Sequence, residues 1–180
     1  PYTTEFVEAH GRYFLYSPVF TVLFAPFAYL PAWLGPFAWN LFNYSLFFMA
    51  IFTLPQQFTQ QQKCRMFLFL LLILGQSLLS FQYNITVAYL FLFAYTLLEK
   101  DRGFLAVLLI MISGCTKVYG IFELALLLCY PHVWRNFGYA VTMGIVLLAL
   151  PLIKIAPADL LPYYEEWCHS LAVHQSTGAY

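Results

Sequence analysis

The chain has 180 residues, of which 62% are hydrophobic and only 9% are charged. Soluble domains carry a much larger charged share, so this composition predicts an integral membrane protein. Eight basic residues balance eight acidic ones, which argues against a nucleic-acid surface, because such a surface needs a basic excess to neutralise phosphates.

The first segment, residues 1–17, is polar and aromatic and is expected to form an outer loop. Prolines interrupt the apolar run over 18–36, and proline both removes a backbone donor and disfavours helix at the preceding residue. We therefore expect a short or re-entrant helix there instead of one straight span. A cleaner span is predicted over 37–54, followed by a glutamine-rich loop over 55–65.

Further apolar runs are predicted to be helices over 66–81, 85–98, 104–114, 121–130 and 137–153. The chain ends in a polar tail, 154–180, which is expected to lie outside the membrane. Together the runs predict an all-α integral membrane protein, with 1–180 forming one domain and 18–153 forming its membrane part. We expect a polytopic bundle of about six to seven short transmembrane or re-entrant helices.

Basic residues fall in three alternate loops, at Lys63, Arg65, Lys100, Arg102 and Arg135. An excess of lysine and arginine predicts that these loops are cytoplasmic. The turns around Gln82 and Lys117 and the polar tail would then share the opposite face. The segment 1–17 would join them only if the run 18–36 is re-entrant.

The runs 66–81 and 85–98 would be about 24 and 21 Å long as helices, short of the ~30 Å hydrocarbon core. Their connecting turn should therefore be recessed, and the same holds for the turn that carries Lys117. Lipid offers no hydrogen bonds to amides and does not solvate an ammonium, so polar groups at this depth usually face a polar cavity. We expect these turns to line one shared site.

Short motifs occur in a fixed order along the chain. Tyr16-Ser17-Pro18 opens the proline-rich run, Gln82-x-Asn84 opens a span, Lys117-Val118-Tyr119 follows a glycine-rich helix, and His174-Gln175-Ser176 follows the last span. In this order they resemble the patterns Y-P-P-x-F, G-Q-x-N, K-x-Y-P and N-Q-S of glycosyltransferase family 87. The resemblance implies a GT-C-type membrane enzyme that uses polyprenyl-phosphate mannose.

The sequence departs from the family pattern at several places. Ser17 replaces the first proline, Gly120 and His174 stand where proline and asparagine are common, and Phe81 precedes Gln82. The family's catalytic aspartate lies in an outer loop upstream of the tyrosine motif, and no aspartate precedes position 101 here. The chain also begins without Met and stops within a polar stretch. We therefore expect an internal fragment whose catalytic aspartate lies upstream of Pro1.

The chemistry that the resemblance implies needs a carboxylate base and a group that stabilises the leaving phosphate. Lys117 is the candidate for the phosphate, as an ammonium in an apolar run with no acid nearby in sequence, with Tyr119 beside it; a lysine that snorkels from a helix end is the alternative. Gln82 and Asn84 could bind sugar hydroxyls, or instead cap helices or join them. The remaining candidates, which could frame the donor entrance or simply form an interfacial belt, are Tyr16 and Arg12.

The tail contains acidic, histidine and aromatic residues, a mixture expected where an outer loop meets a sugar. His174 and Gln175 are substrate-binding candidates because they match the family pattern, whereas Glu165 and Glu166 are more typical of a solvated helix end. No cysteine or histidine has metal-ligand spacing, and the four cysteines lie far apart, so neither a zinc site nor a disulfide framework is indicated. No cofactor is expected, and a role for a divalent ion stays open.

The functional hypothesis is a membrane hexosyltransferase whose expected donor is polyprenyl-phosphate mannose. It would act on a lipid or glycan acceptor at the extracytoplasmic side of a bacterial inner membrane. The alternative is a fragment of a transporter or flippase, in which Lys117 and the amides would line a substrate path. Transporters usually place their binding groups at broken helices near the midplane and connect them by short loops. The long outer tail favours the transferase.

Overall fold

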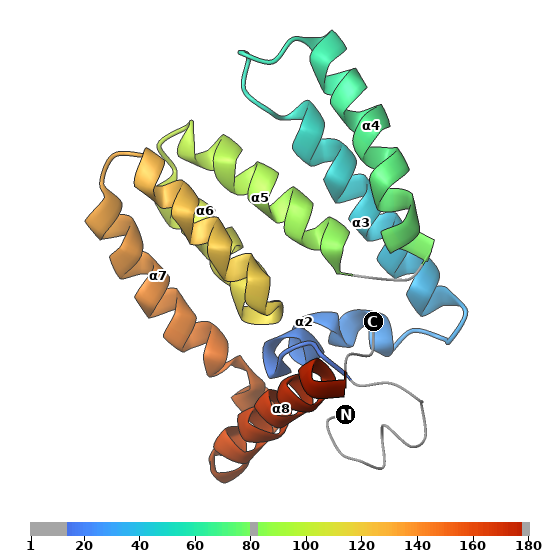
Figure 1. The fold of residues 1–180 in the computed structure, drawn as a ribbon, viewed down its shortest axis with the longest axis vertical. Coiled ribbons are helices and arrows are strands. Elements are labelled where there is room, and N and C mark those ends of the chain that lie inside the picture. The colour runs from blue at the N-terminus through green and yellow to red at the C-terminus, as the bar shows by residue number, and fades with distance from the viewer. Residues whose placement is uncertain (1–13, 80–82, 178–180) are drawn as a thin grey trace.

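The computed structural model describes residues 14–79 and 83–177 (Figure 1). Most of these residues are helical, and none of them lies in a strand. In chain order the elements are α2 (Pro18–Ala28), α3 (Leu34–Phe52), α4 (Gln60–Leu79), α5 (Asn84–Leu98), α6 (Gly103–Thr116), the 3₁₀ helix η1 (Val118–Cys129), α7 (Val133–Leu148), the short 3₁₀ helix η2 (Leu150–Ile153) and α8 (Pro157–Thr177). Each apolar run expected to be helical corresponds to one of these elements, which confirms the all-α prediction.

The proline-rich run forms a short helix, as predicted. In α2, Pro18 occupies the first turn, where a missing backbone N–H costs nothing, and the helix is only 11 residues long, ending at Ala28. Pro31 then accepts backbone hydrogen bonds from Leu34 and Gly35 as the chain turns into α3. Gly35 allows this turn, since a Cβ there would lie 2.7 Å from the carbonyl oxygen of Phe27.

The prediction that the span after the glutamine-rich loop is short was wrong. Helix α4 begins at Gln60, inside the expected loop, and its 20 residues extend about 30 Å. The reason is Lys63, which is 5% exposed and donates from Nζ to the carbonyl oxygens of Phe52 and Leu54. An ammonium that binds the free carbonyls at the end of α3 holds the first turn of α4 in place.

The long helices α3 to α7 run alternately up and down, so their loops gather at two ends (Figure 1). At one end Tyr95 accepts a hydrogen bond from Gln57 in the α3–α4 loop, and Tyr130 after η1 donates to Glu99 after α5. The three loops near the basic residues therefore lie at the same end. The turns before α5 and after α6 lie at the other.

The segment after α6 is a 3₁₀ helix, and only Lys117 separates the two elements. A broader polar turn and an ordinary apolar span had been expected there. At a rise of about 2.0 Å per residue, the 12 residues of η1 extend about 24 Å, against about 22 Å for the 15 residues of α5. The 3₁₀ geometry thus lets a shorter segment match its neighbours in length.

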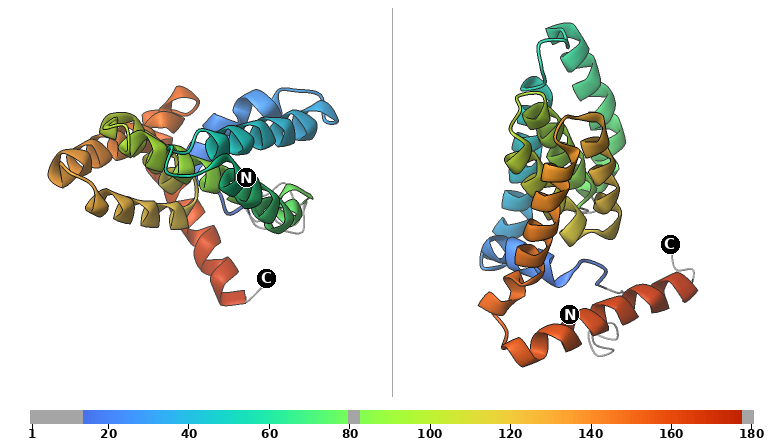
Figure 2. Two further views of the ribbon diagram at one scale, coloured as in Figure 1. Left: turned by 90° about the horizontal axis from the view of Figure 1, so that it is seen from above. Right: turned by 90° about the vertical axis from the view of Figure 1, so that its left-hand side faces the viewer.

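The polar tail is a helix, whereas a loop had been expected. Helix α8 lies across the lower end of the bundle, beside α2 (Figure 2, right). Trp167 donates from Nε1 to the carbonyl oxygen of Leu15 at 3.1 Å, and the Tyr164 hydroxyl donates to that of Leu148 at 3.0 Å. These bonds connect α8 to the segment before α2 and to the end of α7.

The main core lies between α5, α6, η1 and α7, and its fully buried members are Ala94, Ala106, Val107, Ile110 and Leu127. By length and composition, one helical stretch of the described chain could cross a membrane, residues 133–153, with a mean hydropathy of 1.8. Helices α2, α5, α6 and η1 are apolar but shorter.

Candidate functional site

The centre of the candidate site is the side-chain amide of Asn84, the first residue of α5. Its Oδ1 accepts a hydrogen bond from Nζ of Lys117 at 2.8 Å and another from the hydroxyl of Tyr119. The same ammonium lies 4.8 Å from the ring centroid of Tyr119 and 5.4 Å from that of Tyr16. Aromatic faces attract cations, so the two rings and the amide together hold the ammonium in place. We call these four residues the Lys117 cluster.

Backbone contacts between distant segments bring this cluster together. The Tyr16 hydroxyl accepts a hydrogen bond from the backbone N–H of Tyr83, which positions the start of α5. Ser17 donates from its N–H to the carbonyl oxygen of Thr116 and from its hydroxyl to that of Cys115. The last turn of α6 is thereby bound to the start of α2, next to Lys117.

The ammonium of Lys117 is half-buried and lies between α6 and η1, outside both helices. Burial lowers its pKa from the ordinary lysine value. In the described part of the chain no carboxylate lies within ion-pair distance of it, and its partners are neutral. A partly desolvated cation with neutral partners is suited to receive an anionic ligand.

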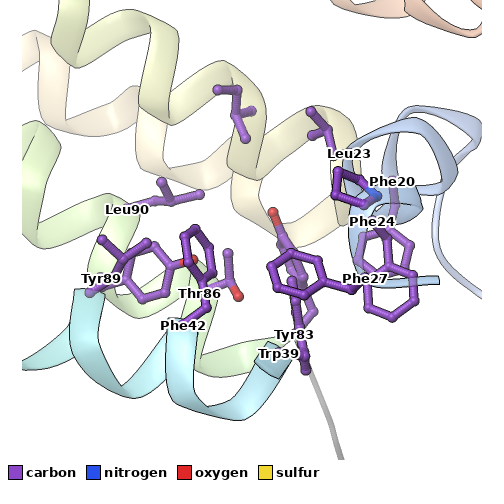
Figure 3. A pocket seen from close by; sticks show the side chains of 13 residues that line it. Phe20, Leu23, Phe24, Phe27, Trp39, Phe42, Tyr83, Thr86, Tyr89 and Leu90 are labelled. Atoms are coloured by element: carbon purple, nitrogen blue, oxygen red, sulfur yellow. The ribbon is translucent and has the colours of Figure 1, made fainter. Parts of the chain in front are cut away.

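An apolar cavity of about 460 Å³ lies between α2, α3 and α5 (Figure 3). Its walls are largely aromatic, and a second cavity of about 230 Å³ shares four of them, Phe20, Phe24, Trp39 and Tyr83. Tyr16 lines the second cavity and also faces the ammonium of Lys117. Tyr16 therefore connects the cation to an apolar surface. This arrangement fits an amphipathic ligand with a negatively charged head.

Comparison with protein families gives a match to the model of glycosyltransferase family 87 over residues 14–179. The chain belongs to this family. It is therefore a glycosyltransferase, as its ordered motifs indicated, and the match covers both the Lys117 cluster and the apolar cavities. Comparisons with curated proteins and with solved structures found no match.

Of the candidate site residues of this glycosyltransferase, the structure brings together Tyr16, Asn84, Lys117 and Tyr119. Gln82 and Arg12 lie outside the described residues. His174, half-buried, and Gln175, exposed, lie near the end of α8 and not on the elements that carry the cluster. A role for these two residues in substrate binding stays a prediction.

Sequence reasoning missed Glu123. We had taken Lys117 to have no acid nearby in sequence, but Glu123 follows it by six positions and is only 9% exposed. Its Oε1 accepts a hydrogen bond from the Ser113 hydroxyl at 2.8 Å. The signal was present, since an isolated glutamate in the apolar run VYGIFELALLLC is as unusual as the lysine.

Within the described residues no group of three or more His, Cys, Asp or Glu side chains could hold a metal ion, and the four cysteines are free. The acids Glu165 and Glu166 are exposed on α8. The chemistry of the described site therefore derives from the ammonium, the amide and the phenols.

Proposed function

We propose that this glycosyltransferase is a polytopic membrane enzyme that transfers a hexose, specifically mannose, from a polyprenyl-phosphate sugar to a lipid or glycan acceptor. Transfer takes place at the extracytoplasmic face of the cell membrane, which in a bacterium is the inner membrane. The observation that carries the proposal is that Tyr16, which faces the ammonium of Lys117, also lines the smaller aromatic cavity.

A polyprenyl-phosphate sugar has a charged phosphate directly attached to a hydrocarbon chain. Lys117 and the Tyr119 hydroxyl supply donors for the phosphate, and Tyr16 connects them to the apolar walls formed by Phe20 and Trp39. A soluble nucleotide-sugar donor would have no use for such walls. The combination therefore favours a lipid-linked donor over a nucleotide-linked one.

The exposed surface supports a membrane location. Large apolar side chains are exposed along several helices, among them Leu41, Phe48, Leu68, Phe69, Leu72, Phe122, Leu128, Val141, Ile145 and Val146. Soluble proteins rarely expose apolar side chains over so many neighbouring helices. Lipid would cover them, and the clustering of the basic loops at one end of the bundle favours placing that end in the cytoplasm.

In the proposed reaction an acceptor hydroxyl attacks C1 of the sugar. The new bond joins the acceptor oxygen to C1, and the bond between C1 and the phosphate oxygen breaks. A base takes the proton of the hydroxyl, and by resemblance to the family this base is an aspartate upstream of Pro1, with inversion at C1. Lys117 stabilises the negative charge that develops on the leaving phosphate.

The test follows radiolabelled mannose out of polyprenyl-phosphate mannose, with the purified full-length protein, membranes and an acceptor extract. Lys117→Ala should lower transfer about 10²- to 10³-fold, as expected for loss of a group that stabilises developing charge. Lys154→Ala is the matched control, because this exposed lysine also lies over a tyrosine ring but outside the cluster. Unaltered turnover in Lys117→Ala would remove Lys117 from the mechanism. Intact donor with the wild-type protein, for mannose and other hexoses, would contradict the proposed donor class.

A further inference from the structure

Glu123 has no part in the proposed chemistry, yet its burial in an apolar helix is unfavourable. Its second oxygen, Oε2, is buried and has no hydrogen-bond partner among the described residues. Such an atom loses its hydration on folding without a hydrogen bond to compensate. An apolar side chain of similar size would therefore give a more stable fold at this position. Packing alone therefore does not explain an acid here.

The 3₁₀ geometry of η1 determines what Glu123 contacts. Three residues complete one turn, so Gly120 and Glu123 lie on the same face, one above the other. Both contact Ser113 of α6. Gly120 packs closely against the backbone of Ser113, and the Ser113 hydroxyl donates a hydrogen bond to Glu123. In an α-helix the same two residues would be about 60° apart around the axis, so the 3₁₀ form aligns them more closely on the face that meets Ser113.

Ser113 also holds the turn that carries the cluster. Its carbonyl oxygen accepts a hydrogen bond from the N–H of Lys117 at 3.0 Å, and the carbonyl oxygen of Lys117 accepts one from Gly120 at 2.8 Å. Ser113, Lys117, Gly120 and Glu123 thus form a closed set of contacts around the turn. The direction in which Lys117 and Tyr119 leave the backbone depends on this set.

We propose that Glu123 is a positioning residue of the glycosyl-transfer site: through Ser113 it keeps η1 in its 3₁₀ form against α6, and so presents Lys117 and Tyr119 to Asn84. The role of the aligned cluster in transfer rests on the proposed function. The alignment itself does not, and can be measured without turnover.

The first measurement is the rate at which Lys117 is acylated by an amine-reactive ester, read by mass spectrometry of its peptide in the full-length protein. Glu123→Leu and Ser113→Ala should each raise this rate about fivefold, the factor expected when one hydrogen bond to the ammonium is lost. Lys154 in the same sample is the internal reference. Leu126→Ala, which removes packing one 3₁₀ turn beyond Glu123, should leave the rate unchanged.

The second measurement is kcat for mannose transfer. Glu123→Leu should lower kcat about 10- to 100-fold, as small displacements of reacting groups do. Glu123→Gln should restore most of it, since its amide oxygen still accepts from Ser113. The double variant Ser113→Ala/Glu123→Leu should be no worse than either single variant, because the two residues act as one unit.

An unchanged acylation rate in Glu123→Leu would overturn the proposal, whether or not the protein transfers sugar. The proposal would also be overturned if kcat of Glu123→Gln were as low as that of Glu123→Leu. The charge of Glu123, and not its hydrogen bond to Ser113, would then matter. Raised acylation in a protein that never turns over the donor would support the positioning role and count against the proposed function. Gly120→Ala is an independent variant, since its Cβ would lie 2.6 Å from Ser113 and should raise the acylation rate likewise.

Discussion

At the scale of single residues, the amide of Asn84 organises the site. One oxygen accepts from both an ammonium and a phenol, so removing any member leaves the others with altered partners. Lys117 was recognisable from the sequence because a cation within an apolar stretch stands out. Its position over the rings of Tyr16 and Tyr119 was not, since the tyrosines come from segments about 100 residues apart.

The lowered pKa of Lys117 predicts the alkaline side of the pH profile. In the proposed mechanism transfer requires the ammonium, so kcat should fall as the pH rises through a pKa below the ordinary value of 10.5. The free energy of unfolding should change in the opposite direction and rise with pH. The contribution of Lys117 to it is fully present above the unfolded-state pKa and is lost as the pH falls through the lowered folded-state pKa. Rate profiles and thermal unfolding, each measured from pH 7 to 10.5, check both trends. If kcat falls only with an apparent pKa of 10.5 or above, the burial of Lys117 is contradicted.

At the scale of elements, Lys63 predicts how α3 and α4 are joined. Lys63→Met keeps the aliphatic stem but removes the donors to Phe52 and Leu54, and should lower the free energy of unfolding by about 1.5–3 kcal/mol. Arg65→Met is the control, since Arg65 is exposed two residues later and should change stability by less than about 0.5 kcal/mol. Thermal unfolding in detergent measures both, and equal losses would show that Lys63 does not cap α3.

Two elements that sequence reasoning misassigned, η1 and α8, escaped it for different physical reasons. A period of 3.0 and one of 3.6 are hard to tell apart in a run as uniformly apolar as η1, so its 3₁₀ form was hidden. Helix α8 has no long apolar stretch and contains Pro162, and it is fixed by Tyr164 and Trp167 docking on distant carbonyls. Long apolar runs such as α3 and α5 were predictable because burial and length decide them locally.

At the scale of the whole molecule, the arrangement predicts two faces. The loops near the basic residues lie at one end, whereas the Lys117 cluster, α2 and α8 lie at the other (Figures 1 and 2). Single cysteines at Lys100 and at Glu165, both exposed, introduced into a cysteine-free protein, should react with an impermeant maleimide from opposite sides of sealed vesicles. Labelling of both from the same side would overturn the proposed orientation.

The period of η1 also limits how its length can change. Deleting three residues would shorten it by about 6 Å and leave every remaining side chain on its original face, whereas deleting one would rotate all that follows by about 120°. Insertions and deletions in multiples of three would therefore conserve the surface that meets α6. In the proposed membrane enzyme this segment can therefore be lengthened or shortened in whole turns, to suit a thicker or thinner bilayer, without redesign of the site at its beginning.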